Sequence, residues 1–291
     1  MLVDSYGRKV TNLRVSLTQR CNLACVYCHA EGELSPSREI SADQIAEILH
    51  TAGRLGIRRV KFTGGEPLLR SDVCEIVASV PSGIESSMTT NGILLEGLAG
   101  DLKRAGLSRV NVSLDTLDPD RYRQITGKDR LPDVLAGIQA ALHENLTPVK
   151  LNMVLLKGIN EDEVDRFLQF IRERDHIILQ LIELLEFNDC TLHADLGSVE
   201  QDLRKHSERI STRRMQHRRK YCVNGAEVEV VRPLHNTEFC AYCNRLRVTS
   251  DGKLKPCLLR ADNHVDISEK KGKELEEIFF EAVRKRSPYF Q

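Results

Sequence analysis

The sequence predicts an α/β fold in which six strand–helix units follow one another and a partly antiparallel region completes the chain. Short runs rich in β-branched residues alternate with segments whose apolar residues recur at helical spacing, and this alternation stops after Phe187. Beyond that point, Asn224-Gly225 separates two alternating runs, which is the strongest short signal for a β-hairpin. We therefore expect one domain over residues 1–187 and a second region over residues 188–291.

Each strand of the first domain is expected where a β-branched run ends in a polar or glycine-rich turn. The six predicted strands are Leu13–Leu17, Arg59–Thr63, Ser86–Thr90, Arg109–Leu114, Val149–Leu155 and Ile177–Leu185. Because helical segments separate them, the strands are expected to run parallel with right-handed crossovers. An open or closed α/β barrel and a doubly wound sheet both satisfy this pattern.

Two of the helices carry start signals. Ser41 with Gln44 and Asn160 with Glu163 each have the spacing at which two side chains cap a helix reciprocally. The apolar positions that follow at helical spacing are Ile45, Ile48, Leu49 and Ala52 in the first helix and Val164, Phe167 and Ile171 in the second.

The composition narrows the functional classes. Of 291 residues, 42 Lys and Arg balance 42 Asp and Glu, which argues against capture of nucleic acid or an acidic membrane by the protein as a whole. Hydrophobic residues are 41% and charged residues 29%, as in ordinary globular proteins. The sequence has neither an apolar run of the ~18 residues that a membrane span needs nor the apolar core of a signal peptide. We expect a cytoplasmic protein whose nine cysteines stay reduced.

A cysteine triad follows the first predicted strand, at the carboxyl end where α/β proteins place their sites. Its members are Cys21, Cys25 and Cys28, in a C-x3-C-x2-C spacing. Thiolates this close in sequence can hold one soft metal centre, and a [4Fe–4S] cluster held by three of them keeps one iron open for a small molecule. A structural zinc ion with a distant fourth ligand is the alternative.

A second triad lies near the end of the chain. Its members are Cys240, Cys243 and Cys257, in a C-x2-C-x13-C spacing. His235 or Cys222 would complete a closed zinc site, whereas three thiolates alone suit a second open cluster. Arg245 and Arg247 share one face of a strand, and a cationic face beside an open metal suits an anionic ligand. From the residues alone, a zinc ion and a second iron–sulfur cluster are both possible at this triad.

The first triad and the turn after the second strand resemble the radical S-adenosylmethionine (SAM) superfamily. Tyr27 precedes the third cysteine, and the turn Gly64-Gly65-Glu66-Pro67 looks like the superfamily's GGEP motif. Glycines let the backbone approach the methionine part of SAM, and a carboxylate can accept from its ammonium group. The resemblance implies a [4Fe–4S] cluster that binds SAM and hydrogen abstraction by a 5′-deoxyadenosyl radical. The residues expected to bind SAM are Tyr27, Gly65, Glu66, Ser113 and Leu185.

Longer segments are similar, in the same order, to GTP 3′,8-cyclases, a family that begins molybdenum cofactor synthesis. These segments are LRVSLTQRCNLACVYC, KFTGGEP, MTTNG, VNVSLD, VKLNMVLLKGIN and FCAYCNRLRVTSDGKLKPC. The resemblance implies a partial (β/α)6 radical SAM barrel with a C-terminal antiparallel extension whose second [4Fe–4S] cluster contacts guanine. It also implies hydrogen abstraction at ribose C3′ of GTP and attack of that carbon on guanine C8, giving 3′,8-cyclo-7,8-dihydro-GTP.

The resemblance extends to GTP contacts and partners. The residues expected to contact GTP are Arg14, Lys61, Thr89, Lys150, Arg245 and Arg247, with Leu246 contributing main-chain contacts. The cations among them suit a triphosphate, which needs several positive donors. The implied partners are a low-potential electron donor, a downstream cyclic pyranopterin monophosphate synthase and, as an option, a second copy of the chain. Neither nucleic acid nor membrane is expected.

Three features depart from the bacterial members of the family. Lys61 stands where they carry Arg, which keeps the charge and loses the bidentate fork. Gln180 stands where many relatives carry Arg, so one phosphate contact is either missing or supplied elsewhere. The chain ends in SPYFQ without a Gly-Gly tail, and both length and ending look more like archaeal members.

Some features have no motif role. The run Arg204–Lys220 holds eight basic residues and one acid and is interpreted as a solvated helix face, with nucleic acid, a partner or the triphosphate as other ligands. Cys74, Cys190 and Cys222 are interpreted as spectators. Two other functions compete: a radical SAM enzyme that modifies a peptide, and a non-catalytic zinc module that binds nucleic acid. The zinc module does not explain the GGEP motif or the six strand–helix units.

Overall fold

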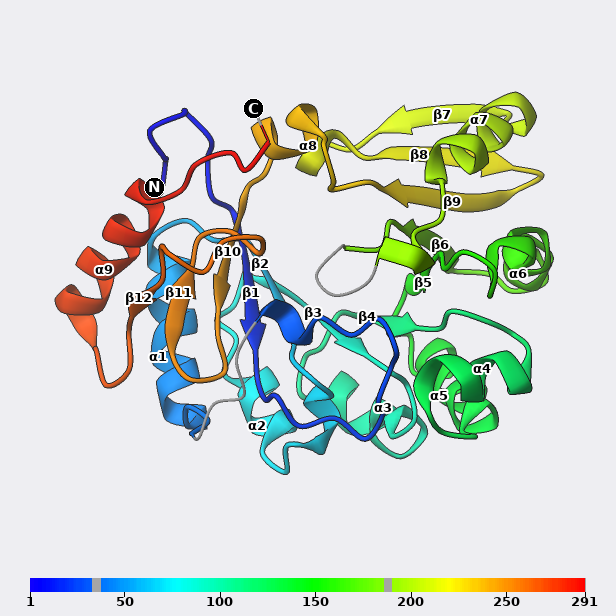
Figure 1. Ribbon diagram of the computed structural model, residues 1–291. Coiled ribbons are helices and arrows are strands. Elements are labelled where there is room, and N and C mark those ends of the chain that lie inside the picture. Colours follow the sequence, from blue (N-terminus) through cyan, green and yellow to red (C-terminus); the bar gives the residue numbers. More distant parts are fainter. Residues whose placement is uncertain (33–37, 186–189, 291) are drawn as a thin grey trace.

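In the computed structural model, which describes residues 1–32, 38–185 and 190–290, twelve strands form one continuous sheet (Figure 1). Its six central strands are β1 Asn12–Ser16, β2 Arg59–Thr63, β3 Glu85–Thr90, β4 Arg109–Ser113, β5 Val149–Val154 and β6 Ile177–Ile182. They run parallel, and neighbours in the sheet are consecutive in the sequence. A doubly wound sheet reverses its strand order at one point, so this arrangement is that of a partial α/β barrel.

Helices surround the outside of these strands (Figure 1). They are α1 Ala42–Arg54, α2 Val73–Ala78, α3 Leu95–Arg104, α4 Pro119–Thr126, α5 Leu131–His143 and α6 Val164–Arg172, with short 3-10 turns η1 Ala30–Gly32, η2 Pro67–Leu69 and η3 Glu161–Glu163. The predicted strand–helix order is confirmed. Among the described residues, no helix is long and apolar enough to cross a membrane.

The caps of α1 and α6 differ from the reciprocal pattern expected. Ser41 does accept from the Gln44 amide (3.2 Å), but the Gln44 side chain donates to the Ile267 carbonyl instead (3.2 Å). Asn160 does not cap α6, because its amide joins the loops after β4 and β5 and accepts from Leu156 N (2.7 Å). Glu163 accepts from Leu117 N (2.9 Å). Ser41 therefore caps α1 as expected, whereas tertiary contacts take up the Gln44 side chain at α1 and both side chains at α6.

The last third of the chain adds strands to both edges of the six-stranded sheet. Its elements are η4 Cys190–Leu192, α7 Leu196–His206, β7 Arg209–Thr212, η5 Met215–His217, β8 Arg219–Val223, β9 Ala226–Val231, α8 Thr237–Ala241, β10 Arg245–Val248, β11 Lys253–Lys255, β12 Val265–Asp266 and α9 Gly272–Arg284. Strand β9 pairs with β6, and β10 pairs with β1, both in parallel. The outer pairs β7–β8, β8–β9, β10–β11 and β11–β12 are antiparallel, which confirms the antiparallel extension.

The hairpin predicted at Asn224-Gly225 joins β8 to β9. Both turn residues have positive φ, 48° and 81°, which is the geometry that favours Asn-Gly in a two-residue hairpin. The division of the chain near residue 187 stays a prediction, since sheet hydrogen bonds run from β6 to β9 across it.

Alternation along the central strands separates the core from a polar interior. Leu13, Phe62, Met88 and Leu151 are fully buried or nearly so and belong to the hydrophobic core shared with the helices. Their neighbours in sequence point to the opposite face because successive strand residues alternate. That inner face carries Arg14, Lys61, Thr89, Asn111, Lys150, Asn152 and Gln180, which all line one cavity. The fold therefore places polar and charged groups inside the curve of the sheet.

Candidate active site

The cavity inside the sheet has a volume of about 420 Å³, and both cysteine triads line it. Cys21, Cys25 and Cys28 follow the carboxyl end of β1, whereas Cys240, Cys243 and Cys257 flank β10 and β11. Because β10 pairs with β1, segments more than 200 residues apart in the sequence meet at one site. All six thiols are free.

The donors of each triad are sulfur atoms only, which suits an iron–sulfur cluster. Across residues 1–32, 38–185 and 190–290, no three His, Cys, Asp or Glu side chains are close enough to hold a single metal ion. His235 and Cys222, the fourth ligands considered for a zinc ion at the second triad, are not among the described residues that line the cavity. Cys222 instead lies on β8 near Glu208.

Burial makes three of the six thiols harder to ionise by raising their pKa values. It raises the pKa of Cys25 to about 12, with help from the Asp115 carboxylate, and raises the pKa of Cys257 as well. Burial also opposes ionisation of Cys243, but the Arg286 guanidinium and the Arg245 amide more than offset it and lower that pKa. Loading the site with metal must therefore release protons.

The glycine turn after β2 lies against the loop that precedes the first triad. Gly65 N donates to the Thr18 carbonyl (2.7 Å), and a Cβ on Gly65 would lie 2.3 Å from the Arg20 carbonyl oxygen. Gly64 has φ 147°, and its Cβ would lie equally close to the Thr18 carbonyl oxygen. Only glycine fits at either position. The turn thus presents bare backbone to the cavity beside the cysteines.

Glu66 is fully buried behind this turn. Its carboxylate accepts from Leu68 N (3.0 Å), Thr90 Oγ1 (2.7 Å) and Asn91 N (2.6 Å), and it joins the carboxyl ends of β2 and β3. Burial raises its pKa to about 7, although these three hydrogen bonds lower it. In the structure, Glu66 shapes the turn, and its expected contact with SAM stays a prediction.

Tyr27, Ser113 and Leu185 line the cavity beside the first triad. The Tyr27 hydroxyl donates to Asp115 Oδ2 (2.6 Å), while Asp115 Oδ1 accepts from Val154 N (2.8 Å). Burial raises the pKa of Asp115 to about 6. The sequence analysis did not select Asp115, although its place just after β4, at the carboxyl end of a barrel strand, is a usable signal.

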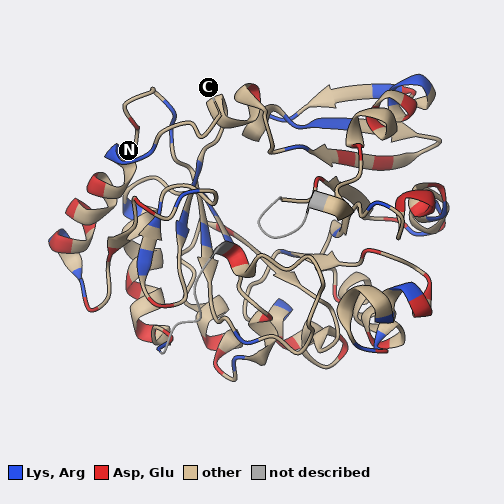
Figure 2. Cartoon of the chain, in the orientation of Figure 1, with Lys and Arg blue, Asp and Glu red and all other residues tan. Residues whose placement is uncertain are grey.

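The expected GTP-binding cations lie side by side. Arg14 on β1 stands in register with Lys61 on β2 and with Arg247 on β10. Figure 2 shows Lys and Arg positions, in blue, on several neighbouring strands of the sheet. Burial, and then the charge of Arg14, lower the pKa values of Lys61 and Arg245. Leu246 alternates with the two arginines of β10 and is fully buried in the core, so its side chain faces away from the cavity.

Two carboxylates partly neutralise the cations. Glu31 accepts from Arg14 (3.0 Å), Arg247 (2.8 Å) and Thr63 Oγ1 (3.1 Å). These two arginines hold the pKa of Glu31 well below its usual range despite its burial. The cavity therefore already places a negative charge between Arg14 and Arg247, where an anionic ligand would compete with it.

The second carboxylate, Glu229, has a completely buried side chain and contacts three cations. Its oxygens lie 2.7 Å from Lys150 Nζ, 3.1 Å from Arg213 Nη1 and 3.0 Å from Arg218 Nη1. Arg213 and Arg218 belong to the basic run, so its interpretation as a solvated helix face is wrong: the run spans the end of α7 and the β7–η5–β8 hairpin. Nothing in the sequence pattern marks these two arginines, because only the β6–β9 pairing brings Glu229 next to the cations that line the cavity.

Gln180 lies next to this carboxylate. It is in register with Glu229 across β6 and β9 and accepts from Asn111 Nδ2 (3.1 Å). Several cavity side chains in the described parts of the chain keep buried polar atoms that lack a hydrogen-bond partner. These atoms are Arg14 Nε, Thr89 Oγ1, Asn111 Oδ1 and Arg218 Nε. Buried polar groups rarely stay unpaired in proteins, so these atoms indicate a place for a polar ligand.

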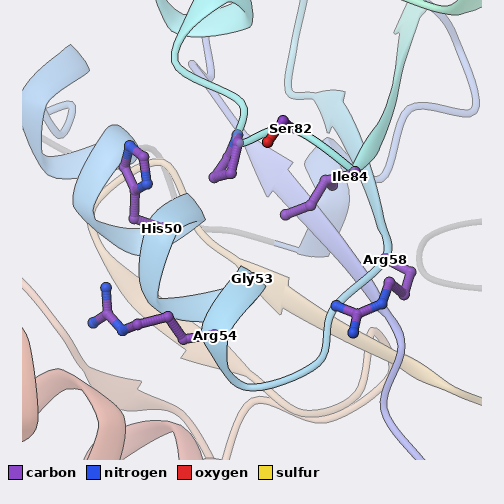
Figure 3. A pocket seen from close by; sticks show the side chains of 8 residues that line it. His50, Gly53, Arg54, Arg58, Ser82 and Ile84 are labelled. Carbon is purple, nitrogen blue, oxygen red and sulfur yellow. The ribbon is translucent and has the colours of Figure 1, made fainter.

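A separate hollow lies at the opposite, amino end of β2 and β3, between α1 and the loop before β3 (Figure 3). Its volume is about 500 Å³, and its lining contains no cysteine. Arg54 in this hollow is paired with Glu276 (3.0 Å), and Arg58 donates to the Ile57 carbonyl (3.1 Å). The chemistry predicted from the sequence is therefore located in the cavity with the thiols.

Comparisons with known proteins agree with this geometry. Residues 15–171 match the radical SAM superfamily, and residues 177–291 match the family described as molybdenum cofactor synthesis C. The chain is 50% identical to the "Probable GTP 3′,8-cyclase" of Methanocella arvoryzae, over 100% of this chain and 95% of that protein. It is 49% identical to the protein of the same name from Archaeoglobus fulgidus, over 100% of both chains.

Solved structures show a similar fold. Streptococcus suis SuiB bound to S-adenosylmethionine has a TM-score of 0.69 and 17% identity, over 94% of this chain and 64% of SuiB, so this chain spans less than two thirds of that protein. Native anSMEcpe with bound AdoMet has a TM-score of 0.65 and 18% identity, over 91% of this chain and 80% of that chain. At these identities the likeness concerns the fold alone.

Proposed function

The chain belongs to the radical SAM superfamily and, within it, to the GTP 3′,8-cyclase family, and on this premise we propose that it converts GTP to 3′,8-cyclo-7,8-dihydro-GTP. This reaction is the first step of molybdenum cofactor synthesis. The observation that carries the proposal is the meeting of two thiol triads and a set of cations in one cavity. Such a cavity has one place for SAM and another for a phosphorylated substrate.

The first triad and the surfaces around it form the SAM site. Cys21, Cys25 and Cys28 would hold a [4Fe–4S] cluster, which together with SAM supplies the radical that abstracts hydrogen from ribose C3′. Gly65 offers bare backbone to the methionine part, while Ser113 and Leu185 line the wall toward the nucleoside. The Tyr27–Asp115 hydrogen bond fixes the ring beside Cys28.

The triphosphate is held by two groups of cations. Arg14, Lys61 and Arg247 form one group on adjacent strands, and Lys150, Arg213 and Arg218 form the other around Glu229. Cations this close together repel one another, and an anion that neutralises them stabilises the cavity. Phosphate oxygens suit this role because they accept strong charge-assisted hydrogen bonds. Arginines from the hairpin thus supply the charge that Gln180 lacks.

The second triad would hold the second [4Fe–4S] cluster, with one iron open to guanine. Cys240, Cys243 and Cys257 face the same cavity as Arg245 and Arg247, so base and phosphates can be bound together. A low-potential donor would supply electrons, and a cyclic pyranopterin monophosphate synthase would consume the product. We also propose a cytoplasmic location, as expected from the sequence.

A peptide-modifying activity is the runner-up. The solved structures of SuiB and anSMEcpe include complexes with peptides, but at 16% and 19% identity they support the fold and not the substrate. The zinc-binding nucleic-acid module is set aside, because the chain belongs to a family of radical SAM enzymes.

The substrate is tested by anaerobic reconstitution with iron and sulfide, followed by dithionite, SAM and either GTP or ATP. We expect 5′-deoxyadenosine to form faster with GTP than with ATP. Equal formation with both nucleotides, or with neither, while both clusters are present, would contradict the assignment of GTP, and a peptide would become the next substrate to test.

The hairpin arginines are tested with a matched pair of variants. Arg218→Gln removes a cavity cation, whereas Arg219→Gln removes its neighbour, whose side chain is 44% exposed and pairs with Glu200 at 3.6 Å. We expect the Kd for GTP to rise about tenfold or more only in the first variant, since a charge-assisted hydrogen bond contributes roughly 1.5–3 kcal/mol. Equal SAM affinity in both variants would show that the fold is intact.

A further inference from the structure

The N-terminal segment and the end of α9 meet behind the second triad. A tight turn over Asp4 to Arg8 is closed by Gly7, which has φ 75° and donates to the Asp4 carbonyl (3.0 Å). Asp4 Oδ1 accepts from the Arg8 amide (2.9 Å), so the turn fixes the direction of its own carboxylate. Arg286 follows α9 almost 280 residues later and reaches the same carboxylate.

Asp4 binds both guanidinium groups. Its Oδ2 atom accepts from Arg8 Nε (2.7 Å) and from Arg286 Nη1 (2.9 Å). The side chains of Asp4, Arg8 and Arg286 are 0%, 8% and 1% exposed. Because two cations meet one carboxylate, the group keeps one net positive charge in a place that water barely reaches.

Both guanidinium groups also bind the main chain of the cysteine triad. Arg8 Nη1 donates to the Cys240 carbonyl (2.8 Å), and Arg286 Nη2 donates to the Cys243 carbonyl (2.7 Å). Arg8 and Arg286 line the cavity together with the three thiols. In the described part of the chain, Arg286 Nε is buried without a hydrogen-bond partner, so one of its N–H groups is left for an acceptor in the cavity.

We propose that Asp4, Arg8 and Arg286 form a charged clamp that positions the second triad and raises the reduction potential of the cluster held there. The proposal rests on the assignment of a second [4Fe–4S] cluster to this triad. The reduction potential of such a cluster depends on nearby charge, on hydrogen bonds to its sulfur atoms and on solvent exposure. A fixed positive charge with little water to screen it favours the reduced, more negative state.

The clamp predicts potential shifts of opposite sign. Arg286→Met and Arg8→Met each remove a positive charge, so the second cluster should become about tenfold harder to reduce, or ~59 mV lower for a one-electron couple. Asp4→Asn removes the negative charge at nearly constant shape and should raise the potential. Arg286→Lys keeps the charge and should move the potential less than Arg286→Met does.

The measurement is a redox titration of the anaerobically reconstituted holoenzyme, followed by electron paramagnetic resonance. Loss of one signal in Cys257→Ser assigns that signal to the second cluster, and iron and sulfide analysis reports how much cluster each variant holds. Arg284→Met, at an exposed position of α9 two residues before Arg286, is the matched control and should leave the potential unchanged.

The outcomes separate the clamp from the proposed function. An unchanged potential at full iron content in Arg8→Met and Asp4→Asn, or shifts of the same sign in both, would overturn the clamp. If Arg286→Met does not fold or does not bind the second cluster, the potentials of Arg8→Met and Asp4→Asn still test the clamp. A wild-type protein with about four irons and no signal sensitive to Cys257→Ser would refute the second cluster itself.

Discussion

Replacing Glu229 by Gln should destabilise the protein while increasing the stabilisation that GTP provides. Glu229 has a side chain that is 0% exposed and lies 2.7, 3.1 and 3.0 Å from Lys150, Arg213 and Arg218. Breaking a buried ion pair by removing one partner costs about 3–5 kcal/mol, because it leaves charge buried without compensation. We therefore expect a loss of roughly 3 kcal/mol in the free energy of unfolding.

Urea unfolding of the reconstituted protein, followed by circular dichroism, measures this loss. For a slope of roughly 3 kcal/mol per M, the midpoint should fall by about 1 M. Because GTP would neutralise the cations that Glu229 releases, saturating GTP should raise the midpoint more in Glu229→Gln than in the wild type. Glu227→Gln, two residues earlier on β9, changes a more exposed ion pair with Lys220 and should have little effect.

The pH dependence gives an independent check. Arg218, Lys150 and Arg213 hold the pKa of Glu229 well below its usual range, although burial raises it. A depressed carboxyl pKa contributes stability above the unfolded value of about 4.3, and this stability is lost as the pH falls toward the folded value. The difference in urea midpoint between the wild type and Glu229→Gln should become smaller below pH ~4. Equal midpoints at pH 7, or a gap that widens in acid, would refute the reasoning.

Three further predictions concern the cavity. Gly65→Ala should abolish SAM binding measured by calorimetry, because the added Cβ would lie 2.3 Å from the Arg20 carbonyl oxygen. The control Gly97→Ala on α3 adds a Cβ in open space and should bind SAM normally. Cys257→Ser should keep SAM binding at the first triad and lose GTP turnover; normal cyclisation by this variant would refute the role of the second cluster. Glu31→Gln should tighten GTP binding by roughly tenfold, because Arg14 and Arg247 lose a competing carboxylate. Unchanged GTP affinity would show that Glu31 does not compete with the substrate.

The strand–helix alternation and both cysteine triads could be predicted from the sequence because each depends on residues that are close along the chain. Periodicity locates β1 to β6 within a few residues, and the spacing of Cys21, Cys25 and Cys28 identifies one metal centre. Such local patterns do not predict contacts between residues that are far apart in the sequence. The contact of the Cys240 carbonyl with Arg8 spans 232 positions.

Sequence patterns also do not show which charged side chains are buried. Eight basic residues in the run Arg204–Lys220 look alike in sequence, yet Arg213 and Arg218 face a buried carboxylate while Arg219 is largely exposed. Which of them point inward depends on the register of β8 with β9 and of β9 with β6. The helix caps were only partly predictable for a related reason. Ser41 caps α1 as expected, but the Gln44 and Asn160 side chains find tertiary partners that a sequence window does not contain.

The pairing of β1 with β10 has a consequence for the order in which the protein is made. On the ribosome, Asn12 emerges long before Arg245, its partner in the register. At ~5–20 residues per second, the outer edge of β1 waits on the order of ten seconds or more with its backbone groups unpaired. An open strand edge is a template for pairing with other chains. The edge of β1 therefore stays open to pairing with other chains until β10 has been synthesised.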